Sequence, residues 1–93
     1  MRSFRHIAAL VKYKRLSHPE KLSQTDLSTL LGYRNGQFIS NVERGICSVP
    51  LKSLKKISSI LNINADELRT AILKDHRETL SNYYNESAEG TLL

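Results

Sequence analysis

Apolar residues recur along the chain with the 3.6-residue period of an α-helix, and no stretch alternates with the two-residue period of a strand. Five stretches carry this period, and each ends at a glycine, an asparagine or a short polar run. The pattern predicts an all-α fold with helices over residues 4–15, 24–31, 37–44, 50–61 and 65–84. Residues 85–93 lack the period and are expected to form a disordered tail.

Polar residues mark where three of these helices begin. Ser3, Ser23 and Asn64 each precede a predicted helix, and their side chains can accept hydrogen bonds from its first N–H groups. Asp26 and Glu67 follow Ser23 and Asn64 by three residues, which is the spacing of a capping box. Two glycines are expected to close the second and third helices: Gly32 and Gly45.

The helix predicted over residues 37–44 has two contrasting faces. Ile39, Val42 and Ile46 share one stripe and are expected to pack into the core. The other face carries polar side chains: Gln37, Ser40, Asn41 and Arg44. Amides can pair with adenine and a guanidinium with guanine through two hydrogen bonds each, so this face suits base contacts in a DNA major groove. The alternative is an ordinary solvated face, although such faces are usually rich in Glu and Lys.

Two charges lie on stripes that are otherwise apolar. Arg15 continues the stripe of the first helix, and Glu43 continues that of the third. A buried charge is costly unless it is paired. We expect Arg15 and Glu43 to pair in the interior and tie the first helix to the third. The alternative is that both side chains reach past the edge of the core into solvent.

Charge is distributed unevenly along the chain. Residues 1–74 hold 13 Lys and Arg against 5 Asp and Glu, whereas residues 75–93 hold 1 against 4. A basic body favours a polyanionic partner such as nucleic acid. No apolar run approaches the roughly 20 residues that span a bilayer, and the first residues lack the cleavage site of a signal peptide. We therefore expect a cytoplasmic protein without membrane contact.

Titratable and nucleophilic residues form no catalytic or ligand-binding motif. Cys47 is the only cysteine and is expected to contribute packing rather than redox sensing. His6, His18 and His76 lie on different predicted elements, which argues against a metal site. The chain also lacks a glycine-rich phosphate loop. We expect no cofactor, no metal and no enzymatic activity.

Two segments share their residue spacing with a known family. They are Leu22-Ser-Gln-Thr-Asp-Leu-Ser-Thr-Leu-Leu-Gly32 and Ile39-Ser-Asn-Val-Glu-Arg-Gly45. This spacing resembles that of the XRE-type helix-turn-helix proteins, which include the phage lambda-like repressors and Cro, and the resemblance covers residues 4–73. It implies a five-helix, lambda-repressor-like domain with an extended C-terminal helix, in which the second and third helices form the helix-turn-helix.

The resemblance also implies roles for individual residues. Gln37 and Asn41 match base-reading positions. Arg15 and Glu43 match a buried ion pair of the phage repressors, in agreement with the pattern of charges. Four residues match positions that contact the DNA backbone: Gln24, Arg34, Asn35 and Lys52.

The chain departs from those repressors before the third helix. The turn there is one residue longer, so Gly36 stands where a side chain often reads a base. Phe38 is then either a thymine-methyl contact or a staple that packs against the second helix.

These features predict a sequence-specific transcriptional regulator, encoded by a bacterium or phage and associated with the nucleoid. We expect a repressor that binds an inverted-repeat operator in double-stranded DNA as a homodimer. Residues 1–74 would form the DNA-binding domain and residues 75–84 an extension of the last helix. The extension carries an apolar stripe that its own domain leaves uncovered, and such stripes usually mark an interface. The expected dimer contacts are Leu80, Tyr83 and Tyr84; the alternative is a solvated tail.

Two other functions remain open. The chain could be the antitoxin of a toxin–antitoxin pair, which represses its own operon while it holds a toxin or another regulatory protein. Co-purification of a second small protein would distinguish this case. A helix-turn-helix fold used only for protein–protein interaction is the other alternative, although it would not require the polar set of Gln24, Gln37, Asn41 and Arg44.

Overall fold

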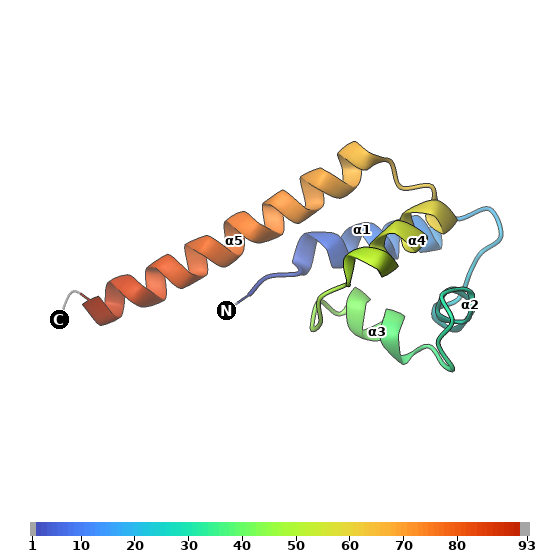
Figure 1. Cartoon of the computed structure of the whole chain (residues 1–93), viewed down its shortest axis with the longest axis horizontal. Helices are drawn as coiled ribbons and strands as arrows, with labels where there is room; N and C mark the ends of the chain where they lie inside the picture. The colour runs from blue at the N-terminus through green and yellow to red at the C-terminus, as the bar shows by residue number, and fades with distance from the viewer. Residues whose placement is uncertain (1, 92–93) are drawn as a thin grey trace.

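Five α-helices make up the secondary structure of residues 2–91, the part of the chain whose backbone this computed structural model describes (Figure 1); side chains are described for residues 2–85. The helices are α1 (Arg5–Leu16), α2 (Gln24–Leu30), α3 (Gln37–Glu43), α4 (Leu51–Leu61) and α5 (Ala65–Thr91). No strand occurs within residues 2–91, so the predicted all-α class is confirmed for that range.

The core is built from the apolar stripes that the periodicity predicts. All five helices contribute to it, and burying each large side chain stabilises the fold by roughly 1.5–3 kcal/mol. Among the described side chains of α5, Ala71 belongs to the cluster and Leu68 packs against it. The buried cluster consists of Ile7, Val11, Leu22, Leu27, Leu31, Ile39, Val42, Leu54, Ile57, Leu61, Ile63 and Ala71.

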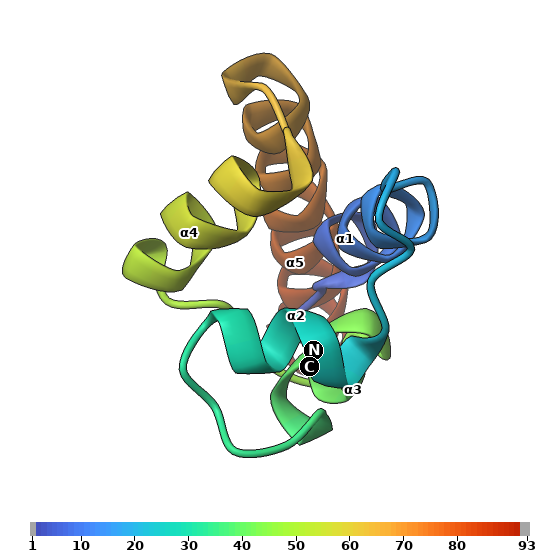
Figure 2. The ribbon, with the colours of Figure 1, turned by 90° about the vertical axis from the view of Figure 1, so that its right-hand side faces the viewer.

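Helix α1 is the central element of the fold. It packs against α3, α4 and α5, while α2 packs on α3. Figure 1 shows α5 running past the other helices, so that its C-terminal half projects beyond them. In the view along the long axis, α1 and α4 flank α5 (Figure 2). The molecule therefore measures 54 × 27 × 21 Å, and the end of α5 accounts for its length.

Both predicted capping boxes are confirmed. The Asp26 N–H donates to Ser23 Oγ over 2.9 Å, and the Ser23 N–H donates to the Asp26 carboxylate over 3.0 Å. At the start of α5, the Glu67 N–H donates to Asn64 Oδ1 over 2.8 Å, and the Asn64 N–H donates back to Glu67 over 3.2 Å. These reciprocal bonds satisfy N–H groups that have no partner within their own helix.

Ser3, the cap predicted for the first helix, makes only one long contact there: its Oγ accepts the N–H of Arg5 over 3.4 Å. Helix α1 begins at Arg5, with Phe4 rather than Ser3 at the N-cap position. The next two donors of the first turn go to Asp75 of α5: the N–H of His6 donates to Oδ1 over 2.6 Å and that of Ile7 to Oδ2 over 2.9 Å. An ionised carboxylate is a stronger acceptor than a hydroxyl and favours the positive end of the helix dipole.

Two further expectations differ from the structure. Ile46 was expected in the core but is 62% exposed, because α3 ends at Glu43 and Gly45, at φ +72°, turns the chain away. Helix α5 continues to Thr91 instead of ending at Tyr84. Apolar periodicity reports packing rather than helicity, and nothing before Gly90 in this segment interrupts a helix. The rest of the expected disordered tail, residues 92 and 93, lies outside the described residues.

Candidate nucleic-acid interface

Helix α3 is fixed to the molecule through its apolar face. Ile39 and Val42 are both fully buried. At its first turn, Gly36 lies against Thr25 of α2: a Cβ added to Gly36 would be 2.9 Å from Thr25 Oγ1 and 3.2 Å from the Thr25 backbone nitrogen. A side chain at position 36 would therefore push α3 away from α2. Glycine at this position sets the distance between the two helices.

The opposite face of α3 carries a hydrogen-bonded polar network. Asn41 Oδ1 accepts from Gln37 Nε2 over 2.8 Å and from Arg44 Nη2 over 2.7 Å. Gln37 and Arg44 are exposed, and Ser40 and Asn41 are half-buried. The structure thus brings the four predicted base-reading residues together on one face. The network orients two amides and a guanidinium, and it leaves the Asn41 amino group and the Gln37 carbonyl for an outside partner.

The turn before α3 is held by two local contacts. Asn35 Oδ1 accepts a hydrogen bond from the N–H of Gln37 over 2.9 Å, so this predicted backbone contact also caps the start of α3. The rings of Tyr33 and Phe38 stack with centroids 4.3 Å apart and planes at 17°. Phe38 therefore packs against Tyr33 and the edge of the core, as a staple does, and its contact with a thymine methyl stays a prediction.

The buried ion pair predicted between Arg15 and Glu43 is confirmed. Arg15 Nε and Nη2 donate to the two Glu43 oxygens over 2.6 and 3.0 Å, and the two side chains are only 10% and 2% exposed. Arg15 Nη1 also donates to the carbonyl of Leu22 over 3.0 Å. The hydrogen bond to Glu43 raises the pKa of Arg15 and outweighs the opposing effect of burial. The pair joins α1 to the end of α3.

The residues predicted to contact the DNA backbone fall into two groups. Arg34 and Lys52 are exposed, and Lys52 lies in the first turn of α4. Gln24 instead donates from Nε2 to Glu43 over 3.0 Å, so its amino group supports the buried ion pair. The sequence missed this role because Gln24 and Glu43 come together only when α2 packs on α3.

Three cations that the sequence did not single out lie near α3. Arg2, Arg5 and Lys12, from α1 and the residues before it, line an open hollow of about 450 Å³ together with Arg44. Glu43 also lines this hollow, but its carboxylate is bound by Arg15. The overall excess of basic residues was visible in the sequence. The position of these three beside α3 depends on the crossing of α1 over α3, which local pattern does not reveal.

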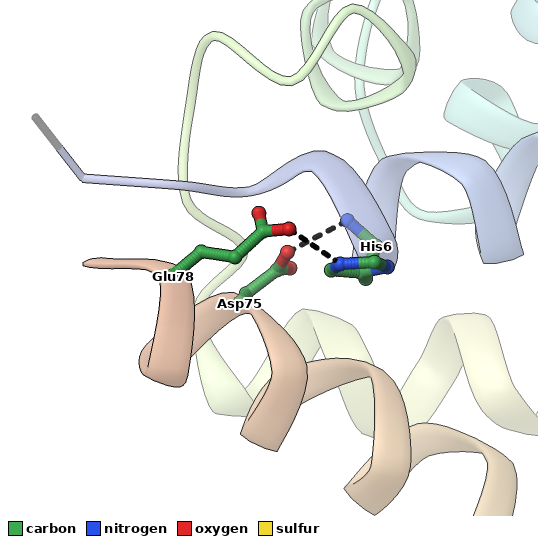
Figure 3. A group of neighbouring side chains, drawn as sticks. All are labelled: His6, Asp75 and Glu78. Carbon is green, nitrogen blue, oxygen red and sulfur yellow. Dashed lines mark hydrogen bonds and ion pairs between the residues drawn. The ribbon is translucent and has the colours of Figure 1, made fainter. Parts of the chain in front are cut away.

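A second polar cluster joins the start of α1 to the middle of α5 (Figure 3). His6 Nε2 lies 2.9 Å from Glu78 Oε1, beside the Asp75 carboxylate that caps α1. Ser3 Oγ donates to Glu78 Oε2 over 2.8 Å, and Arg5 pairs with Glu78 Oε1. The Ser3 hydroxyl, His6 and Arg5, in that order, lower the pKa of Glu78 to about 2. Asp75 and Glu78 lie in the segment expected to be an extension outside the domain of residues 1–74, yet they contact residues 3–7 of that domain.

Apolar side chains lie exposed along α5. Leu80, Tyr83 and Tyr84 are 53%, 67% and 74% exposed, so the predicted stripe is uncovered in the single chain. Nearer the start of the same helix, Ile72, Leu73, Asp75 and His76 line an open hollow of about 510 Å³. Its apolar lining comes from α1 and the residue before it, from α4 and the loop before it, and from α5: Phe4, Ile7, Val49, Pro50, Leu51, Leu54, Ile72 and Leu73.

Comparison of the chain with protein-family models, with curated proteins and with solved structures finds no match. Within the described residues, none of the helices combines the length and the apolar character that a membrane span requires.

Proposed function

We propose that the chain is a sequence-specific DNA-binding regulator of the lambda-repressor-like class, with α2 and α3 as a helix-turn-helix. The observation that carries this proposal is the network of Gln37, Asn41 and Arg44 on a helix whose other face is anchored in the core. A short helix that offers amides and a guanidinium to solvent suits insertion into a major groove.

The proposed reading mechanism divides base contacts from phosphate contacts. Gln37 and Asn41 would exchange their mutual hydrogen bond for pairs with adenine, and Arg44 would pair with guanine, with Ser40 as a smaller contact. Exposed cations around α3 would hold the phosphates and fix the register of the helix on the duplex. These cations are Arg2, Arg5, Lys12, Arg34 and Lys52, and the Asn35 amino group would add a neutral contact.

We further propose that the protein acts as a homodimer on an inverted repeat and represses transcription there. One such domain covers about half of a typical operator, and a two-fold dimer presents a pair of reading helices to successive major grooves. The uncovered stripe of Leu80, Tyr83 and Tyr84 on the projecting end of α5 supports this assembly.

Selection from random DNA duplexes on the purified full chain tests the proposal. We expect the wild-type chain to select an inverted-repeat consensus. Gln37→Ala and Asn41→Ala should each lose base preference at one position per half-site, and each should weaken binding to the consensus by about 1–3 kcal/mol. Lys52→Ala should weaken all duplexes alike and reduce the salt dependence of binding by about one charge. Lys56→Ala, further along the same exposed helix, serves as the matched control.

Failure to enrich any consensus would overturn the proposal in favour of a fold used only for protein contacts. A consensus that both α3 variants leave unchanged would instead show that α3 does not read the bases. Co-purification of a second small protein with the wild-type chain would favour the antitoxin alternative.

A further inference from the structure

We propose that His6, Asp75 and Glu78 bind a divalent first-row transition metal, with Zn²⁺ as the best match (Figure 3). One imidazole nitrogen and one oxygen from each carboxylate lie within 4.8 Å of one another. Zinc takes nitrogen and oxygen ligands at about 2.0–2.2 Å and often leaves a fourth position to water. The imidazole favours such a metal over Mg²⁺ or Ca²⁺, which prefer oxygen alone. None of the three ligands is a proposed DNA contact, although Arg5, one of the proposed phosphate contacts, pairs with Glu78.

Asp75 provides a fixed point in this group. Its side chain is buried, and each carboxylate oxygen accepts a backbone N–H from the first turn of α1. A carboxylate oxygen has two lone pairs, so a hydrogen-bonded oxygen can still bind a cation. Because one of the donors is the N–H of His6, the same contacts fix the residue that supplies the imidazole.

Metal binding would change the distances among the three ligand atoms, which now lie within 4.8 Å of one another. Ligands around a tetrahedral zinc are about 3.3–3.5 Å apart, as bonds of about 2.0–2.1 Å require. His6 Nε2 and Glu78 Oε1 are 2.9 Å apart and are joined by a hydrogen bond. A metal in place of this hydrogen bond would bind Nε2 of an imidazole that carries its hydrogen on Nδ1.

Charge also favours a dication at this point. Asp75 and Glu78 are three residues apart on α5, where like charges repel unless a cation lies between them. Arg5 now balances Glu78, but its side chain is 73% exposed, and surface ion pairs of this kind contribute little. A dication would neutralise both carboxylates and release the guanidinium to solvent. The Arg5 guanidinium therefore competes with the metal for Glu78.

Binding of Zn²⁺ to the chelator-treated, tag-free full chain tests the site. Isothermal titration should show one equivalent of Zn²⁺, and Co²⁺ should give the visible absorption of a low-coordinate site with nitrogen and oxygen ligands. His6→Asn and Glu78→Gln should each abolish both signals while circular dichroism stays helical. His76→Asn, next to Asp75 in sequence, is the control and should leave both signals intact.

Arg5→Ala separates a metal site from a simple ion-pair cluster. If the cluster binds metal, removing the competing guanidinium should tighten Zn²⁺ binding. If Arg5 and His6 are only partners of Glu78, Arg5→Ala should produce no Zn²⁺ binding either. No saturable binding to the wild-type chain, or binding that survives both His6→Asn and Glu78→Gln, overturns the proposal.

Discussion

Glu43 accepts hydrogen bonds from two neighbouring helices through a side chain that is almost fully buried. Two come from Arg15 and one from Gln24. A buried ion pair is not necessarily more stable than an apolar pair of the same volume, but breaking it by removing one partner leaves an uncompensated charge. Glu43 is therefore a point where a single substitution has a large effect.

Glu43→Ala should lower the free energy of unfolding by about 3–5 kcal/mol, because it leaves the Arg15 guanidinium buried without its counter-charge. Urea denaturation followed by circular dichroism measures the change. Arg69→Ala is the control, since Arg69 pairs with Asp66 on the surface and its loss should change stability by less than about 1 kcal/mol. Equal midpoints for the two variants would contradict a structural role for the buried pair.

Ser28 leads to a prediction of opposite sign. Its side chain in α2 is fully buried, and Oγ has no hydrogen-bond partner among the described residues. Ser28→Ala removes an unsatisfied hydroxyl and should raise the unfolding free energy by about 1 kcal/mol. Ser23→Ala, which removes the α2 cap, should lower it by a similar amount. A melting temperature that falls in Ser28→Ala would show that the hydroxyl has a partner in solution.

At the scale of elements, α1 and α5 are joined through charged groups as much as through apolar packing. The pKa of Glu78 is about 2 in the folded protein and ordinarily 4.5. As pH falls, the unfolded chain therefore takes up this proton first, so the stability that Glu78 contributes is complete above about pH 4.5 and is lost toward pH 2.

Melting temperatures measured between about pH 5 and pH 2 should fall more steeply for the wild type than for Glu78→Gln. The pKa values of Asp26 and Glu67 are also lowered, so both proteins lose some stability at low pH for this reason. Only the difference between the two curves reports on Glu78. Parallel curves for the two proteins would show that Glu78 is not held by Ser3, His6 and Arg5 in solution.

Contacts between residues close in sequence were predictable, whereas most contacts between distant residues were not. The capping boxes at Ser23 and Asn64 were predictable because donor and acceptor are three residues apart. The Arg15–Glu43 pair was predictable because each charge interrupted an apolar stripe. The cap of α1 was not, since Asp75 is 69 residues from His6 and its position depends on the path of α5. The same separation concealed the cluster of His6, Asp75 and Glu78.

At the scale of the whole molecule, the projecting end of α5 carries apolar side chains that nothing in a single chain covers. We predict that replacing Leu80, Tyr83 and Tyr84 together with serine converts a dimer to a monomer, because the apolar stripe would no longer gain from burial. Sedimentation of the full chain measures this. Tyr13→Ser with Leu16→Ser, at exposed apolar positions on α1, is the control and should leave the dimer intact.

The same sedimentation result for wild type and triple variant would contradict an interface on this stripe. Shortening the chain after Lys74 is a poorer test, because it also removes Asp75, Glu78 and Thr79, which bond to residues 3–7. A loss of dimer in that truncated chain could then reflect unfolding of α1.

The bonds between the start of α1 and the middle of α5 also bear on the order of folding. They join residues 68 to 76 positions apart, so a nascent chain cannot form them until residues 75–79 have been synthesised. Closing so large a loop is entropically costly, and the contacts should form after the folding transition state. Asp75→Asn should then accelerate unfolding while leaving the folding rate nearly unchanged, as stopped-flow kinetics can show. When a protease cleaves the opened chain faster than the chain can refold, the rate of proteolysis equals the rate of unfolding. The bonds from Asp75 to α1 would then determine how long the folded protein resists proteolysis.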